Sequence, residues 1–173
     1  KQKLFIAAGL LALIVSCDPP KHGISRVANI DPYSYTINKR TESENGAVVS
    51  AHPLASKVGL SMLKRGGNAV DAAIATQLAL AVVYPNAGNI GGGGFMVARL
   101  ADGKLVTLDY REMAPGSASR DMYLDEKGNV REGQSMNGHL SSGVPGTIAG
   151  IFASMKYAKL SFTALIQPAI DLA

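Results

Sequence analysis

The fold is decided by the stretch NAGNIGGGGFMVAR, residues 86–99, in which four consecutive glycines separate two apolar segments. Residues 69–83 before the glycines are almost wholly apolar, and residues 95–110 after them alternate between apolar and polar side chains. Glycine costs about 0.5–1 kcal/mol relative to alanine in regular structure, but it permits positive φ and close approach of another backbone. We therefore interpret Gly91–Gly94 as a tight passage from a buried helix into a strand, with a flexible hinge as the alternative.

The segment before the glycines predicts two successive helices. Leu54, Val58 and Met62 form an apolar stripe in a helix that begins at His52-Pro53 and ends in Lys64-Arg65-Gly66-Gly67. Residues 69–83 predict a second helix, apolar on nearly all sides and therefore central to a core. Asn68 is its expected N-cap, and Asp71 suits a capping role better than a catalytic one.

The segment after the glycines predicts a hairpin of residues 95–100 and 105–110, joined through Asp102-Gly103, where both positions can take positive φ. A first strand is expected at residues 46–50. Further along, the patterns indicate an exposed hairpin, a loop and two helices, the last capped by Ser161 and kinked or shifted by Pro168. These lie at residues 122–130, 137–147, 148–158 and 161–172.

Composition favours a folded domain and argues against nucleic-acid binding. Of the 173 residues, 47% are hydrophobic, which is enough to build a core. The net charge of +4 includes Lys1 and Lys3 of a leader; without them 15 basic residues face 13 acidic ones, a net +2. The chain has no basic run and no Trp, so it lacks a phosphate-tracking surface with stacking aromatics.

The leader has the layout of an export signal. A basic start is followed by an apolar run, Leu4 to Val15, and by Ser16-Cys17. Cys17 is the only cysteine, and its position resembles the lipid-attachment site of bacterial lipoproteins; an ordinary signal peptide is the alternative. We expect residues 1–17 to be a lipoprotein-type signal peptide and residues 18–45 a tether. The protein is then exported, periplasmic or on the cell surface, and membrane-anchored through lipid.

Common catalytic motifs are absent from the sequence. There is no phosphate-binding loop, the glycine run lacks the dinucleotide spacing, and no serine has glycine two residues away on both sides. The three histidines are far apart, so metal ligation is not indicated. Ser61-Met62-Leu63-Lys64 fits the Ser-x-x-Lys pattern of penicillin-recognising enzymes, but the accompanying Ser-Asp-Asn and Lys-Thr-Gly motifs are missing. Composition and spacing alone support an exported α/β-type domain.

Five motifs between Gly46 and Ala173 together resemble one known family. They are Gly66-Gly-Asn-Ala-Val-Asp-Ala-Ala73, Pro85 with Gly88-Asn-Ile-Gly-Gly-Gly-Gly-Phe-Met96, Asp109-Tyr-Arg-Glu-Met-Ala-Pro115, Arg120-Asp-Met122 and Gly143-Val-Pro-Gly-Thr147. In content and order this passage is similar to the first third of the large subunit of the γ-glutamyltranspeptidases, also called glutathione hydrolases. A set of ordered motifs is far more specific than any single one.

The resemblance implies an α/β (α+β layered) fold, a fragment of the α-β-β-α sandwich of an N-terminal nucleophile hydrolase. It implies a precursor that cuts itself into large and small subunits, and residues 46–173 as an incomplete N-terminal part of the large subunit. The nucleophile of such enzymes is the Thr exposed at the start of the small subunit, which lies beyond Ala173. No catalytic residue therefore falls in this fragment, which alone should be inactive, and no metal or organic cofactor is implied. The implied partners are glutathione and other γ-glutamyl compounds, the small subunit and a membrane.

Arg111 is the residue to which the resemblance assigns a function. Taken alone, an Arg at the end of a strand most often forms surface ion pairs, here with Glu112 or Asp109. Within its motif, Arg111 matches the family's Arg that binds the α-carboxylate of the γ-glutamyl group. Two alternatives remain: a related acylase (cephalosporin acylase or poly-γ-glutamate processing), and a lipoprotein binding module that has lost catalysis.

Overall fold

The computed structural model describes residue 31, residues 33–37 and residues 39–173. The expected signal peptide, Cys17 and much of the expected tether lie outside these residues. The elements in order are α1 (Pro53–Lys64), α2 (Ala69–Val83), α3 (Pro85–Gly88), β1 (Phe95–Arg99), β2 (Leu105–Asp109), the 3₁₀ turn η1 (His139–Ser141), α4 (Thr147–Ser154), the 3₁₀ turn η2 (Met155–Tyr157) and α5 (Phe162–Leu172).

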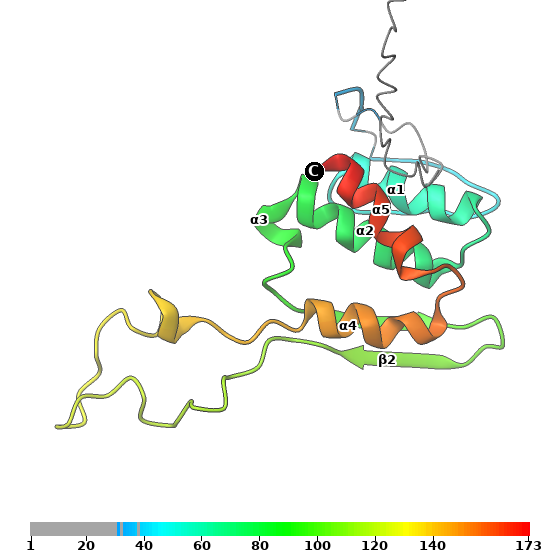
Figure 1. The fold of residues 1–173 in the computed structure, drawn as a ribbon. Coiled ribbons are helices and arrows are strands. Elements are labelled where there is room, and N and C mark those ends of the chain that lie inside the picture. The colour runs from blue at the N-terminus through cyan, green and yellow to red at the C-terminus, as the bar shows by residue number, and fades with distance from the viewer. Residues whose placement is uncertain (1–30, 32, 38) are drawn as a thin grey trace, which may run out of the picture.

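Helices α1, α2 and α5 pack together as one group, and α4 lies between this group and the hairpin of β1 and β2 (Figure 1). The long connection from β2 to α4 extends to one side of the hairpin (Figure 1). Helix α2 lies at the centre because it contacts both α1 and α5 and reaches α4. The buried core accordingly draws Ala55, Val58 and Met62 from α1, Val70, Ile74, Ala75, Leu78 and Ala79 from α2, Ile151 from α4, and Leu165 and Ala169 from α5.

The two predicted helices before the glycines are confirmed, and so is the N-cap expected at Asn68. In α1 the His52 side chain accepts a hydrogen bond from the Leu54 N–H. In α2 the Asn68 side chain accepts from Val70 N and Asp71 N, while Asp71 accepts from the Asn68 N–H at 2.7 Å. This is a complete capping box, which satisfies N–H groups that the first helical turn leaves unpaired. The capping role predicted for Asp71 is therefore confirmed.

The predicted hairpin is also confirmed, and β1 pairs antiparallel with β2 from Phe95 opposite Asp109 to Arg99 opposite Leu105. Only Gly103 takes positive φ in its turn, so the expectation for Asp102 is wrong. Gly103 N–H donates to Leu100 O, which closes a turn that needs one left-handed residue. One face of the hairpin is half-buried on the α4 side; the other leaves Phe95, Val97 and Leu105 exposed.

The strand expected at residues 46–50 does not form in the described part of the chain. The segment has no regular secondary structure, and residues 47–50 make no backbone–backbone hydrogen bonds there. A strand exists only through hydrogen bonds to a neighbouring strand, and none of the described residues supplies one. Val49 consequently stands 87% exposed.

The second predicted hairpin is reduced to a single bridge between Leu124 and Val130. Its turn is built around the Asp125 carboxylate, which accepts hydrogen bonds from Lys127 N, Asn129 N and the Asn129 side-chain amide. The Asn129 backbone N–H and then its side-chain amide are the main causes that lower the pKa of Asp125. The side chain is fully exposed, so this turn carries local order only.

The last two predicted helices are present with shifted ends. The first is α4, which begins at Thr147 and gives way to η2 at Met155. The second is α5, which is capped by Ser161 as expected and contains Pro168 without a shift of its start. In the part of the chain that the structure describes, no helix combines the length and apolar character required to span a membrane.

Candidate functional site

Three segments that are distant in sequence meet at the end of the hairpin where β1 begins and β2 ends. They are the glycine run Gly91–Gly94, the segment 110–113 and the segment 143–147, which leads into α4. Gly94 and Tyr110 exchange two backbone hydrogen bonds, of 3.0 and 3.3 Å, and Met113 and Val144 exchange two more, of 2.8 and 3.1 Å. Gly92 O accepts from Gly146 N at 2.9 Å and from Thr147 N at 3.0 Å. The backbone on both sides of Arg111 is thereby held in place.

The glycine run serves this junction by allowing close approach. None of Gly91–Gly94 takes positive φ, so the freedom that the sequence suggested is not used. A Cβ on Gly93 would lie 2.6 Å from Tyr110 O and 2.8 Å from both Arg111 Cα and Glu112 N. The run is a passage into β1, as predicted, but the short helix α3 separates it from the core helix α2. Its purpose is to admit the backbone of residues 110–112.

Arg111 extends from this fixed backbone with its side chain 67% exposed. The backbone N–H of Arg111 donates to the Asp109 side chain at 3.0 Å, which closes a small turn directly after β2. The guanidinium lies 4.0 Å from Glu112 Oε2 (measured from Nε), and its Cζ lies 6.0 Å from the Phe95 ring centroid. An exposed ion pair at that distance contributes little. The backbone of Arg111 is therefore held, while its charged end can exchange Glu112 for another carboxylate.

A pocket of about 280 Å³ lies next to Arg111, between the end of β2 and α4. Its walls are mostly apolar or backbone; Arg111 is the cationic residue among those that line it, and Asp109 is the acidic one. Such a pocket suits a carboxylate carried on a short aliphatic chain, because the planar fork of guanidinium donors matches two carboxylate oxygens. The lining residues are Leu108, Asp109, Tyr110, Arg111, Met113, Val144, Pro145, Gly146, Ala149, Gly150 and Ala153.

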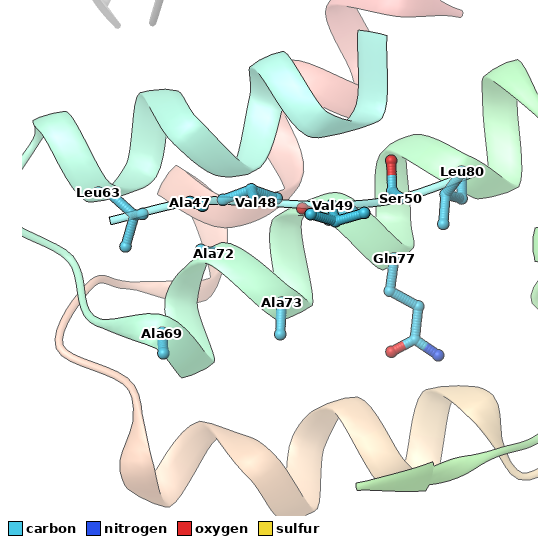
Figure 2. Close-up of a pocket in the computed structure, with 11 residues that line it drawn as sticks. Ala47, Val48, Val49, Ser50, Leu63, Ala69, Ala72, Ala73, Gln77 and Leu80 are labelled. Carbon is cyan, nitrogen blue, oxygen red and sulfur yellow. The ribbon is translucent and has the colours of Figure 1, made fainter. Parts of the chain in front are cut away.

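A larger pocket, of about 420 Å³, lies elsewhere and carries no chemistry. Figure 2 shows it beneath the extended segment Ala47–Ser50, with Ala69, Ala73 and Gln77 of α2 along its other side. None of the residues that line it is ionisable. It marks the uncovered side of α2 and of the unpaired segment, so size alone does not identify the site.

Two other candidates from the sequence have structural roles. The Asp71 carboxylate is fully buried and accepts from Lys159 N and Leu160 N as well as from Asn68 N. The Ser61 hydroxyl, in the Ser-x-x-Lys pattern, donates to Val58 O at 2.7 Å inside α1 and is 9% exposed. Neither group faces a pocket that holds a partner for catalysis. Within residues 31–173, apart from the two undescribed positions, no three His, Cys, Asp or Glu side chains gather around a metal position.

Sequence reasoning missed the contribution of Tyr110 and of the segment that leads into α4. The sequence carries no signal for Tyr110, because its pattern is that of the last residue of an ordinary strand. Gly143, Gly146 and Gly150 read as loop and helix residues. Their spacing of three and four was the available signal, since it keeps one side of the α4 entrance free of side chains. Only the folded chain shows that this side faces Tyr110 and Arg111.

The family model for gamma-glutamyltranspeptidase matches residues 55–173. A glutathione hydrolase proenzyme of Pseudomonas sp. (strain A14) is 58% identical over 132 residues, which cover 76% of this chain and 23% of that relative. A second, from Escherichia coli (strain K12), is 46% identical over 147 residues, which cover 82% of this chain and 25% of the relative. The chain thus spans about a quarter of the length of these curated relatives.

Solved structures share the fold. The γ-glutamyltranspeptidase of Helicobacter pylori superposes with a TM-score of 0.74 at 52% identity, covering 78% of this chain and 39% of that one. A cephalosporin acylase from Bacillus halodurans superposes with a TM-score of 0.64 at 33% identity, covering 84% of this chain and 27% of the other. The chain is therefore an α/β fragment of the N-terminal nucleophile hydrolase sandwich, as its motifs indicated.

Proposed function

The chain belongs to the γ-glutamyltranspeptidase family, and on this basis we propose that it forms part of an enzyme that cleaves γ-glutamyl amide bonds. The substrates are glutathione and other γ-glutamyl compounds, and the γ-glutamyl group passes to water, amino acids or peptides. The names of its relatives, glutathione hydrolase proenzymes, support both the substrate and a precursor that is cut into subunits.

Within this chain, Arg111 binds the α-carboxylate of the γ-glutamyl group. The observation that carries the proposal is the Arg111 side chain, 67% exposed on a fixed backbone, in a residue that lines a small and mostly apolar pocket. A γ-glutamyl group presents a carboxylate and two methylenes before the scissile carbonyl, which matches a cation next to apolar walls. Displacing Glu112 costs little, because that contact is long and solvated.

The covalent chemistry belongs to residues beyond Ala173, as the family resemblance implies. The Thr at the start of the small subunit adds its Oγ to the γ-carbonyl carbon, and its own amine takes the hydroxyl proton. The C–N bond breaks, the amine product leaves with that proton, and an ester joins the γ-glutamyl group to Thr. Water or an amine then attacks the ester and regenerates the hydroxyl. The contribution of Arg111 is to hold the other end of the substrate.

The test uses the complete protein expressed from its gene. We expect a precursor that splits into two subunits and then releases p-nitroaniline from γ-glutamyl-p-nitroanilide, faster when a dipeptide acceptor is added. A processed protein without this activity would overturn the proposal.

A related acylase is the second candidate, favoured by the superposition on the Bacillus halodurans cephalosporin acylase. The position of Arg111 favours a substrate with a free α-carboxylate, and hence γ-glutamyl compounds. Parallel assays on the γ-glutamyl anilide and on a β-lactam with an amide-linked side chain separate the two. Preferential hydrolysis of the β-lactam amide would identify the acylase.

We also propose export with a lipid anchor at Cys17, on the strength of the leader's basic start, apolar run and lone cysteine. Growth with labelled palmitate should label the wild-type protein, which should partition into detergent, and Cys17→Ser should abolish both. A periplasmic protein that takes up no palmitate label and does not partition into detergent would indicate an ordinary signal peptide.

A further inference from the structure

Tyr110 directly precedes Arg111 and leads the chain out of β2. Its backbone forms a hydrogen-bonded pair with Gly94, and its ring lies over that glycine: a Cβ on Gly94 would be 3.0 Å from Cε2 and 3.1 Å from Cζ and the hydroxyl oxygen. An aromatic ring folded over a cross-strand glycine shields backbone that would otherwise face solvent. The hydroxyl end of the ring therefore packs against Gly94 of the glycine run.

The other half of the same ring is seated on α4. A Cβ on Gly150 would collide with Cγ and with both Cδ atoms of Tyr110, so the ring packs on the helix backbone itself. Gly150 is buried, and the neighbouring turn of α4 is tied to β1 by the Ser154 hydroxyl, which contacts Met96 Sδ at 3.6 Å. Helix α4 and the hairpin are therefore in contact through Tyr110.

This packing fixes the position from which Arg111 extends. The Arg111 N–H is held by Asp109, and the next paired residue, Met113, is held by Val144. The packing of the Tyr110 ring on Gly94 and Gly150 sets the distance between the end of β2 and α4, and hence the position of the strand end relative to the pocket between them. We infer that Tyr110 and Gly150 are positioning residues for Arg111. The inference rests on the proposed carboxylate-binding role of Arg111.

Gly150→Ala in the full-length enzyme tests the inference, because the added methyl group must displace the Tyr110 ring from its position on α4. We expect KM for γ-glutamyl-p-nitroanilide to rise at least tenfold while kcat stays within threefold, with the precursor still processed. A merely structural defect would instead lower kcat, by reducing the active fraction, and leave KM unchanged. Tyr110→Leu, which introduces no clash, should show the same rise in KM and serves if Gly150→Ala yields no processed enzyme.

A second substrate isolates the carboxylate. The compound 4-aminobutyryl-p-nitroanilide is the same amide without the α-carboxylate, so Arg111 has nothing to bind in it. Its kcat/KM should be lower than that of the γ-glutamyl anilide in the wild type and change less than threefold in Gly150→Ala. An equal loss on both substrates would overturn the inference.

Two further variants separate the possible failures. Gly116→Ala adds a methyl group where nothing lies within 4 Å, so it should stay within twofold of the wild type. Arg111→Gln should raise KM for the γ-glutamyl anilide. If it does not, the proposed role of Arg111 fails; if it does but Gly150→Ala and Tyr110→Leu leave KM unchanged, only the positioning inference fails.

Discussion

The Asp71 carboxylate accepts a hydrogen bond of 2.8 Å from the backbone N–H of Leu160, although the two residues lie 89 positions apart in the chain. The same carboxylate accepts from Lys159 N and from Asn68 N, the N-cap of α2. One fully buried side chain therefore ties the start of α2 to the segment that leads into α5. The Asn68 side chain adds to this tie by donating to Tyr157 O at 2.7 Å.

Asp71→Asn should destabilise the full-length protein by about 3 kcal/mol. The neutral amide keeps one acceptor oxygen but turns an NH₂ group toward backbone N–H donors, so buried donors lose their charge-assisted partner. Chemical unfolding followed by intrinsic fluorescence measures the loss as a lower midpoint.

Asp121→Asn is the matched control for this substitution. Its carboxylate is 63% exposed, and among the described residues its ion-pair partner is Arg120, itself 94% exposed, so the change should stay within about 0.5 kcal/mol. Equal midpoints for Asp71→Asn and Asp121→Asn would show that the buried tie contributes no stability.

Gly93→Ala should cost about 2 kcal/mol, whereas Gly91→Ala in the same run should cost much less. The new methyl group on residue 93 meets backbone atoms of Tyr110, Arg111 and Glu112, which move only with the whole strand end. At residue 91 it meets the Asn89 side chain, which can rotate away. Unfolding midpoints of the two variants provide the comparison, and equal losses would mean that the run acts only through its flexibility.

Arg111→Lys should raise KM for glutathione while self-cleavage of the precursor survives. The ammonium keeps the charge but loses the two-pronged contact, and an imperfectly paired buried carboxylate costs on the order of 2–5 kcal/mol, or tens to thousands of fold in affinity. Steady-state kinetics on the processed enzyme measure the change in KM, with Arg120→Lys as a control at an exposed position. Unchanged kinetics on glutathione would remove Arg111 from the binding site.

Local signals made the secondary structure largely predictable. His52-Pro53 and the N-cap Asn68 marked the starts of α1 and α2, and Asp102-Gly103 located the hairpin, because these signals act between residues a few positions apart. The strand expected at residues 46–50 depended on a neighbour that local sequence cannot supply. The hydrogen bond from Leu160 N to Asp71 could not be predicted for the same reason. A capping role already accounted for an aspartate at this position, so nothing in the local sequence pointed to a distant partner.

The site was less predictable than the fold. From the residues alone, Arg111 read as a surface ion pair, and the structure does place Glu112 beside it at 4.0 Å. Its expected role came only from the family motif. The seat of Tyr110 on Gly94 and Gly150 depends on how the hairpin and α4 pack, which no pattern within either element records.

Residues 46–173 expressed alone should be poorly soluble and should release no p-nitroaniline. One face of the hairpin leaves Phe95, Val97 and Leu105 exposed, and the backbone of residues 47–50 is unpaired in the described structure; both features promote association. Size-exclusion chromatography with light scattering should show aggregates, and Val97→Lys with Leu105→Lys should shift the material toward monomer. The matched control, Lys104→Gln with Lys127→Gln, changes exposed positions outside that face and should not. A monodisperse, cooperatively unfolding monomer of the unmodified fragment would contradict this expectation, because it would mean that the uncovered hairpin face needs no further partner.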